Sequence, residues 1–336
     1  MSLGRPSLRL AAPALAAALA LSALPAAAHP PVPVGTLETV ALFDAAQLET
    51  PESVVFDRSG NVYLSLALTG EIRKIAPNGA QSTLAFLPIG PPLTPCFGFF
   101  AIQGGLAFDG HGSLFVSVAS CDLANRGIWR VSLDDGAASL IANLPGEALP
   151  NGIALFHDDV YVADSAGPRI WRAPQEGGAA EVWIEDPRLA APPGSPFPGA
   201  NGLQVFRHEL YVSVSATGQI LAIPFVHHDD AGILRVHAQL PPPLGCDDFA
   251  FDVHGALYCG TDPFNSLVKV SPDGTSEILL TAADGLDGPT SMAFGVHGED
   301  RKNLYLANAA FPFFTTTFRP SLLRYRLGVV GAPRGQ

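Results

Sequence analysis

A six-fold internal repeat constrains the fold of this 336-residue chain more than any other feature. Each repeat opens with a short apolar segment such as residues 52–57, which leads through a polar turn into a second one such as residues 62–65. A third strand pattern follows, for example residues 71–75, and a fourth is visible in most repeats. The repeats begin 43 to 51 residues apart, at Glu52, Gln103, Asn151, Asn201, Asp247 and Thr290. Four strands with this period predict an all-β, six-bladed β-propeller with four antiparallel strands in each blade.

The two ends of the repeat region complement each other. The last repeat ends after its third strand pattern, and residues 36–43 are an unassigned apolar segment near the other end. We expect this N-terminal strand to complete the sixth blade and close the ring, because an open ring leaves unpaired strand edges. A sandwich or a solenoid would also use many of the 34 glycines and 31 prolines, but neither explains the six repeats and the leftover strand.

Residues 1–28 have the three-part pattern of a secretory signal peptide. Arg5 and Arg9 precede an uncharged Ala/Leu run over residues 10–24, and residues 26–28 are alanines, which a signal peptidase accepts. An uncleaved membrane anchor is the alternative, but the run is short for one. We therefore expect cleavage before His29, a single propeller domain over residues 29–336, and a secreted or periplasmic location.

Charge and hydropathy limit the partners of the mature chain. The net charge of the full chain is −12, which argues against a nucleic-acid partner, whose phosphates attract basic proteins. No later stretch reaches about 18 uninterrupted apolar residues, so we expect no membrane contact after signal cleavage. The expectation is a monomer that binds a small-molecule substrate.

Four cysteines remain in the predicted domain, and an exported chain with an even count is a candidate for disulfides. Cys96 and Cys121 fall in two loops at the same end of the second blade. Cys246 and Cys259 fall at one edge of two neighbouring antiparallel strands. The predicted pairs are therefore Cys96–Cys121 and Cys246–Cys259.

The propeller topology places the six repeat starts at one end of the central channel, which we call the top end. All six residues carry side-chain oxygen, and Glu52 and Asp247 are carboxylates. Converging oxygens with two negative charges suit a hard divalent ion such as Ca²⁺. The alternative is that Asn-Gly and Asp-rich pairs simply mark turns.

Histidines offer no conventional catalytic triad at the top end. Five of them lie in the turns between first and second strands, at the bottom end of the channel, where we expect exposed turn residues. These are His111, His157, His208, His254 and His297. A Ser-His-Asp triad therefore has no histidine at the channel mouth.

The strand starts resemble the senescence-marker/gluconolactonase/luciferin-regenerating family of six-bladed propellers, also called regucalcin-like. The resemblance is carried by residues 51–57, 150–154, 200–203 and 247–252 and extends over essentially the whole mature chain. It implies that four side chains ligate one calcium or similar divalent ion, namely Glu52, Asn151, Asn201 and Asp247. Asp247, as the carboxylate beside the ion, is also the residue we expect to assist proton transfer.

Four positions depart from that family. The sugar-lactone enzymes have an arginine where this chain has Leu149, and organophosphate-hydrolysing relatives have an aspartate where it has Ala250. Thr290 replaces a ring histidine, and Asp248 stands where glycine is frequent. The resemblance therefore supports the metal ligands in this chain more strongly than it supports any particular substrate.

The loops at the top end are rich in phenylalanine and proline, over residues 91–100, 192–198, 241–243 and 311–314. They predict an apolar or aromatic ligand, although they could instead pack on each other. The leading interpretation is an exported, metal-dependent, gluconolactonase-like hydrolase of a small lactone or ester. A non-catalytic ligand- or protein-binding propeller and a strictosidine-synthase-like enzyme remain alternatives, because the fold alone does not decide function.

Overall fold

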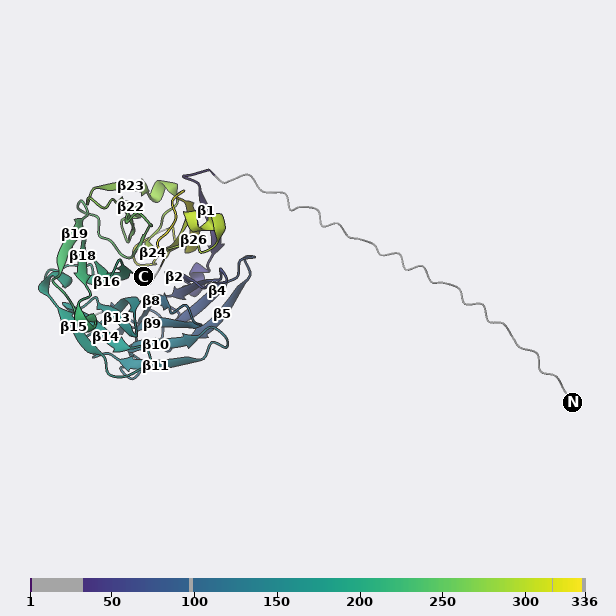
Figure 1. The fold of residues 1–336 in the computed structure, drawn as a ribbon, viewed down its shortest axis with the longest axis horizontal. Coiled ribbons are helices and arrows are strands. Elements are labelled where there is room, and N and C mark those ends of the chain that lie inside the picture. Colours follow the sequence, from purple (N-terminus) through teal and green to yellow (C-terminus); the bar gives the residue numbers. More distant parts are fainter. Residues whose placement is uncertain (2–32, 97–98, 316, 334–336) are drawn as a thin grey trace. The chain divides into compact units, whose positions relative to one another are not determined.

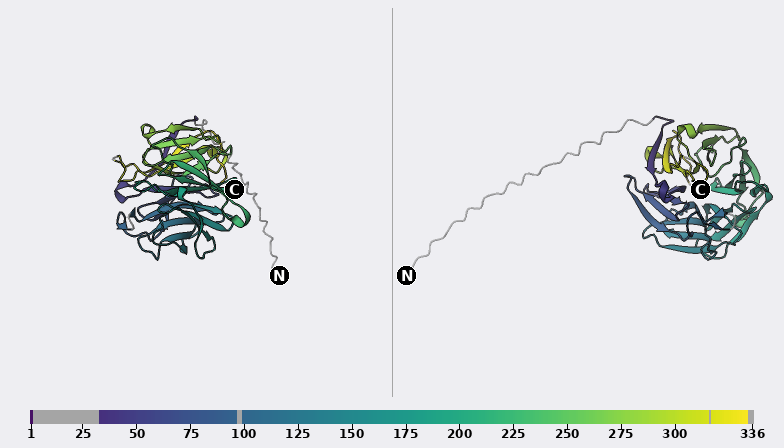
Figure 2. Two further views of the ribbon diagram at one scale, coloured as in Figure 1. Left: turned by 90° about the vertical axis from the view of Figure 1, so that its left-hand side faces the viewer. Right: turned by 180° about the vertical axis from the view of Figure 1, so that it is seen from behind.

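The computed structural model shows six four-stranded antiparallel sheets arranged around a common centre (Figure 1). The same ring is seen from behind in Figure 2. The structure describes Met1 and residues 33–96, 99–315 and 317–333, so most of the predicted signal peptide lies outside it. The prediction of an all-β, six-bladed propeller is confirmed.

The strands of each blade are hydrogen-bonded in sequence order from the channel outward, and in blade 6 the N-terminal strand takes the outer place. Blade 1 comprises β2 (Pro51–Phe56), β3 (Val62–Leu66), β4 (Glu71–Ile75) and β5 (Gln81–Phe86). Blade 2 comprises β8 (Ile102–Phe108), β9 (Ser113–Ala119), β10 (Gly127–Ser132) and β11 (Ala138–Asn143). Blade 3 comprises β12 (Pro150–Phe156), β13 (Asp159–Asp164), β14 (Arg169–Pro174) and β15 (Glu181–Glu185). Blade 4 comprises β16 (Ala200–Phe206), β17 (Glu209–Val214), β18 (Gln219–Pro224) and β19 (Arg235–Gln239). Blade 5 comprises β20 (Phe249–Phe251), β21 (Leu257–Thr261), β22 (Ser266–Val270) and β23 (Ser276–Leu280). Blade 6 comprises β24 (Pro289–Phe294), β25 (Asn303–Asn308), β26 (Ser321–Arg326) and β1 (Leu37–Leu42).

Burial decreases from the channel to the rim, which is why the first and second strands of each repeat read as the most apolar. Strands β2 and β3 are buried along their whole length, whereas most of β5 is exposed or half-buried. The core lies between blades, where side chains of neighbouring sheets interdigitate. Between blades 3 and 4, for example, Phe156 packs in one cluster with Leu203 and Val205. Removal of this apolar surface from water makes the largest favourable contribution to the folding free energy of such a ring.

The N-terminal strand closes the ring as predicted. Strand β1 pairs antiparallel with β26, with Leu37 opposite Tyr325 and Leu42 opposite Ser321. Glu38 forms an ion pair with Arg324 on the neighbouring strand. The sixth blade therefore joins the two ends of the domain.

Deletion of residues 33–43 should unfold the sixth blade. The deletion exposes the edge of β26 and removes the apolar contacts that Ala41 and Phe43 make with blade 1. We expect a drop in melting temperature of roughly 10 °C or more and aggregation on heating, measured by calorimetry and light scattering. A Glu38→Gln variant, which removes only the ion pair, is the control and should change the melting temperature by about 2 °C or less. An unchanged melting temperature after deletion would contradict this closure.

The C-terminal tail covers the bottom end of the channel. Gly331 forms a bridge with Asp252, and the backbone N–H of Ala332 donates to the carbonyl of Phe251 at 2.8 Å. With the ends of the inner strands, this tail lines a cavity of about 250 Å³. The bottom end is therefore partly filled by the chain itself.

The remaining elements are short and lie in loops: the hairpin β6 (Pro95–Cys96) and β7 (Phe99–Phe100), and the 3₁₀ turns η1 (Ala45–Gln47), η2 (Pro187–Leu189), η3 (His227–Asp229), η4 (Ala282–Asp284) and η5 (Gly298–Lys302). Within the described ranges, none of the helices has the length and apolar character needed to cross a membrane. Both predicted disulfides are present, and each joins Cα atoms 5.7 Å apart.

Candidate functional site

One cavity of about 330 Å³ opens at the top end of the channel, where the first strands begin. Its walls include all four predicted ligand residues: Glu52, Asn151, Asn201 and Asp247. They come from blades 1, 3, 4 and 5, so residues almost 200 positions apart in sequence share one site. The structure thus brings the four together, while their role as ligands stays a prediction.

An irregularity in strand pairing lies at each of three predicted residues. The register of the inner hairpin shifts between Pro51 and Ser53, around Glu52. It shifts in the same way around Asn151 in blade 3 and around Asn201 in blade 4. Such bulges re-aim side chains and are enriched near functional sites. The same shift occurs at Gln103 and Thr290, so the bulge is a feature of the blade start and not of the predicted ligands alone.

The glycines that follow the two asparagines serve close packing rather than turns. A Cβ atom on Gly152 would lie 2.1 Å from the carbonyl oxygen of Asn201. A Cβ atom on Gly202 would lie 2.5 Å from a carboxylate oxygen of Asp248. Only glycine therefore lets the inner strands approach this closely at the axis. The interpretation of the Asn-Gly pairs as turn markers is wrong for both positions.

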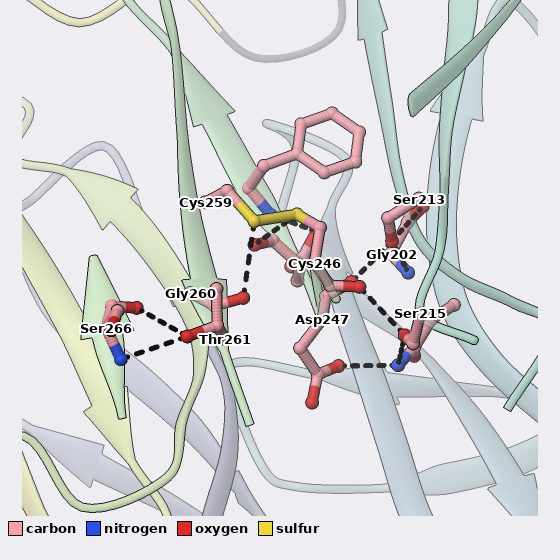
Figure 3. The surroundings of a disulfide bond; sticks show 12 residues. Gly202, Ser213, Ser215, Cys246, Asp247, Cys259, Gly260, Thr261 and Ser266 are labelled. Carbon is pink, nitrogen blue, oxygen red and sulfur yellow. Dashed lines mark hydrogen bonds between the residues drawn. A yellow bond between two sulfur atoms is a disulfide. The ribbon is translucent and has the colours of Figure 1, made fainter. Parts of the chain in front are cut away.

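Asn201 and Asp247 are joined directly across the boundary of blades 4 and 5. The Asn201 amide nitrogen donates to Oδ1 of Asp247 at 2.7 Å and to Oγ of Ser215 at 2.9 Å. The hydroxyl of Ser215 in turn donates to the carbonyl of Cys246 at 2.8 Å. Figure 3 shows Asp247 and Ser215 facing each other within this network. The two predicted ligands are therefore held in contact by the protein.

Glu52 is buried, and its Oε2 atom has no hydrogen-bond partner among the described residues. Burial, together with the negative charges of Asp262 and Asp248, raises the pKa of Glu52 to about 8. Burial and then the charge of Glu52 hold the pKa of Asp247 well above its usual range, while the Asn201 hydrogen bond acts in the opposite direction. The two carboxylates therefore disfavour each other's ionised form in the absence of a cation.

Asp262 is a further carboxylate of the cavity that the sequence reasoning missed. It follows the end of β21, lines the same cavity, and has a buried Oδ1 atom without a hydrogen-bond partner among the described residues. Burial, with the charge of Asp287, raises the pKa of Asp262 to about 7. Its signal was available, since loops after second strands return to the top end and Asp262 comes directly after such a strand.

Two of the six strand starts do not contribute to the cavity. The amide nitrogen of Gln103 donates to the carbonyl of Glu71 at 3.2 Å, and the hydroxyl of Thr290 lies 3.3 Å from the carbonyl of Pro51. Both side chains thus bind backbone carbonyls instead of facing the axis. The expectation that all six oxygens converge is wrong for these two positions.

Asp248 has a structural partner in blade 6. Its Oδ2 atom accepts a hydrogen bond from Ser291 at 2.8 Å, and its Oδ1 atom accepts one from the backbone N–H of Phe249. Asp248 therefore links blades 5 and 6, and its charge reaches the site through space, where it raises the pKa of Glu52.

The turn histidines lie where the sequence predicted them. His111, His157, His208, His254 and His297 are all exposed, in the turns between first and second strands. The described residues that line the cavity include no histidine. The site's ionisable groups are thus carboxylates.

The Cys246–Cys259 disulfide lies directly beside Asp247 (Figure 3). It ties the segment before β20 to β21, and the backbone N–H of Asp247 donates to the carbonyl of Gly260 at 2.8 Å. The bridge and the hydrogen bond together fix the backbone from which the Asp247 carboxylate projects.

Replacing both Cys246 and Cys259 by alanine should lower stability and also weaken calcium binding. The loss of the cross-link should cost about 3 kcal/mol of unfolding free energy. We further expect calcium affinity to fall roughly ten-fold, because without the disulfide the Asp247 carboxylate is less ordered and must be ordered again when calcium binds. The matched control is the double alanine variant of Cys96 and Cys121, which should lose similar stability but keep its calcium affinity. Equal calcium affinity in both variants, measured by calorimetry, would refute the positioning role.

The donor set of the cavity fits calcium better than a transition metal. Across the described residues, no three His, Cys, Asp or Glu side chains gather closely enough to ligate one ion. The predicted set instead combines two carboxylates with two amides, and hard ions such as Ca²⁺ accept both kinds of oxygen. The unpartnered Oε2 of Glu52 is a buried acceptor that a cation would satisfy. A half-turn of the Asn201 amide would present its oxygen beside Asp247.

No protein-family model matches the chain, and no curated protein matches it in sequence. Solved structures do match in fold. A luciferin-regenerating enzyme aligns at 15% identity over 90% of this chain and 98% of its own, with a TM-score of 0.65. A calcium-binding regucalcin from Agrobacterium tumefaciens aligns at 13% identity over 89% and 95%, with a TM-score of 0.63. A gluconolactonase from Xanthomonas campestris aligns at 16% identity over 88% and 89%, with a TM-score of 0.62. The structural neighbours of this chain are thus gluconolactonase, regucalcin and luciferin-regenerating enzyme, whose six-bladed fold it shares at low sequence identity.

Proposed function

We propose that this protein is an exported, calcium-dependent hydrolase of a small lactone or ester. The observation that carries the proposal is the gathering of Glu52, Asn151, Asn201 and Asp247 in one cavity at the top of the channel. A calcium-binding regucalcin and a gluconolactonase among proteins with this fold support it. The N-terminal pattern of residues 1–28 supports export.

The four side chains would hold the ion, which would polarise the carbonyl of the bound substrate. Asp247 is the proposed proton acceptor, because it faces the cavity and Asn201 orients its Oδ1 atom. In hydrolysis, water adds to the carbonyl carbon, the bond from that carbon to the ring or ester oxygen breaks, and the leaving oxygen takes up a proton. A carboxylate at this position could accept a proton from water and return it to the leaving oxygen.

The proposal is tested with a panel of lactones and esters in the presence of calcium and after its removal by a chelator. We expect hydrolysis that requires calcium and falls at least about 100-fold in Asp247→Asn, since general acid–base catalysis contributes on that order. The control is Glu147→Gln, which alters an exposed carboxylate of the same cavity and should keep most of the activity. If no lactone or ester in the panel reacts while calcium still binds, the alternative of a non-catalytic binding propeller holds instead.

A further inference from the structure

The cavity has two chemically distinct parts. The carboxylates and amides lie toward the channel, and the rest of the wall is mostly apolar side chains from top loops. The apolar wall includes Phe99, Leu149, Phe197, Pro263, Phe313 and Phe314. These residues come from blades 2 to 6, so the apolar lining surrounds the mouth instead of forming one side of it.

The phenylalanines of this wall pack on one another and still leave surface open. Phe313 stacks on Phe311 at a ring distance of 5.0 Å and contacts Phe100 at 5.6 Å and Phe314 at 4.8 Å. Even so, 37% of Phe313 and 50% of Phe314 remain exposed. The loops therefore do pack on each other, as the alternative held, but they also present aromatic surface at the cavity. Exposed apolar surface of this kind marks binding sites.

The serine hydroxyl groups of the wall already donate hydrogen bonds to backbone carbonyls. Ser165 donates to the carbonyl of Ala200 at 2.7 Å, and Ser215 donates to that of Cys246 at 2.8 Å. Ser195 donates to the carbonyl of Phe197 at 3.1 Å. The hydroxyl groups of a polyhydroxylated ligand could donate to the carboxylates, but their oxygens would lose the hydrogen bonds that water donates and find few donors here in exchange, which disfavours binding.

The charges of the cavity select against anions. Its ionisable residues are Glu52, Glu147, Asp247 and Asp262, and the described residues that line it include no lysine or arginine. A phosphorylated or carboxylate-bearing ligand would meet carboxylates without a basic side chain to balance it. Of the anionic, polyhydroxylated and apolar ligand classes, the neutral and apolar class fits this cavity best.

From this wall we infer that the substrate is an uncharged, apolar lactone or ester, whose hydrocarbon part lies against Phe313 and Phe314, and not a sugar lactone. The inference rests on the proposed hydrolase function for the reacting group and on the wall for the rest of the molecule. The cavity of about 330 Å³ suits a small molecule of this kind.

Binding of stable lactam analogues tests the inference separately from hydrolysis. The probes are 3,4-dihydroquinolin-2-one, which mimics an aromatic lactone, and gluconolactam, which mimics a sugar lactone. We expect calorimetry on the calcium-loaded protein to show the aromatic lactam binding at least about ten-fold more tightly, since its ring buries apolar surface. Equal affinities, tighter gluconolactam binding, or binding of neither compound would overturn the inference.

Variants locate the apolar subsite. The double variant Phe313→Ser, Phe314→Ser should weaken binding of the aromatic lactam roughly ten-fold and leave calcium binding unchanged. Phe86→Ser is the matched control, because Phe86 is 65% exposed but lies on the outer strand β5. Weakening by the control, or none by the double variant, would place the ligand elsewhere and contradict the inference.

The corresponding lactones separate the two proposals. Preferential hydrolysis of dihydrocoumarin over gluconolactone supports both the hydrolase proposal and the apolar substrate class. Preferential hydrolysis of gluconolactone supports the hydrolase and overturns the apolar substrate class. If the aromatic lactam binds and neither lactone is hydrolysed, the apolar ligand class holds and the hydrolase proposal fails.

Discussion

Calcium should raise the melting temperature of the wild-type protein by about 5 °C at roughly pH 8, and should not raise that of Glu52→Gln. A ligand present at about 100 times its dissociation constant stabilises the folded state by about 2.7 kcal/mol. Glu52 supplies one of only two carboxylates in the predicted ligand set, and its buried Oε2 atom has no other partner among the described residues. Its loss should therefore remove most of the affinity.

The same substitution should have the opposite effect on the calcium-free protein. Near pH 8 the wild type carries a buried, partly ionised Glu52 whose charge is opposed by burial and by Asp262 and Asp248. Glu52→Gln removes that charge and should raise the melting temperature of the chelator-treated protein. Glu147→Gln is the control, since that carboxylate lines the cavity but is exposed. A variant that responds to calcium as the wild type does would show that Glu52 is not a ligand.

Stability of the calcium-free protein should fall as the pH rises from about 4.5 to about 8. The pKa of Glu52 is about 8 in the folded chain, against an ordinary value of 4.5, and that of Asp262 is about 7. The folded state therefore holds more protons than the unfolded state in this range, so the free energy of unfolding decreases as the pH increases. We expect a drop in melting temperature of about 5 °C or more over the range.

Calcium should remove most of this pH dependence, because a bound cation compensates the charges that the protein alone disfavours. The calcium-induced rise in melting temperature should thus be larger near pH 8 than near pH 5. Glu52→Gln should show a shallower decrease without calcium. Thermal unfolding of both proteins across this range, with and without chelator, checks the prediction. A stability that rises through the range would contradict the raised pKa values.

The architecture could be predicted because each repeat contains the same local signals. A buried inner strand such as β2 and its partner β3 recur with a polar turn between them, and burial of these strands makes them apolar in every blade. The leftover strand β1 pairs with β26 because the sixth blade is the one with only three strands of its own. The topology placed all six strand starts at one end, and the resemblance to the regucalcin-like family then singled out Glu52, Asn151, Asn201 and Asp247.

The rest of the site depends on side-chain direction, which the repeat does not determine. Gln103 and Thr290 occupy strand starts like the others, yet their side chains bind backbone carbonyls of neighbouring blades. Asp248 follows Asp247 directly but turns to Ser291. Asp262 could have been found, because it directly follows the second strand of blade 5 and such loops return to the top end, but the repeat does not show that its side chain enters the cavity.

Calorimetric titration of calcium into the chelator-treated protein, repeated in buffers of different ionisation enthalpy near pH 7, tests the metal centre most directly. The pKa of Glu52, raised to about 8, means that near pH 7 a proton occupies Glu52 in most molecules before calcium binds. Calcium should therefore bind at about one ion per chain and release about one proton or more, seen as a buffer-dependent heat. Absence of binding, or binding without proton release that persists in Glu52→Gln, would contradict a calcium centre at the top of this channel.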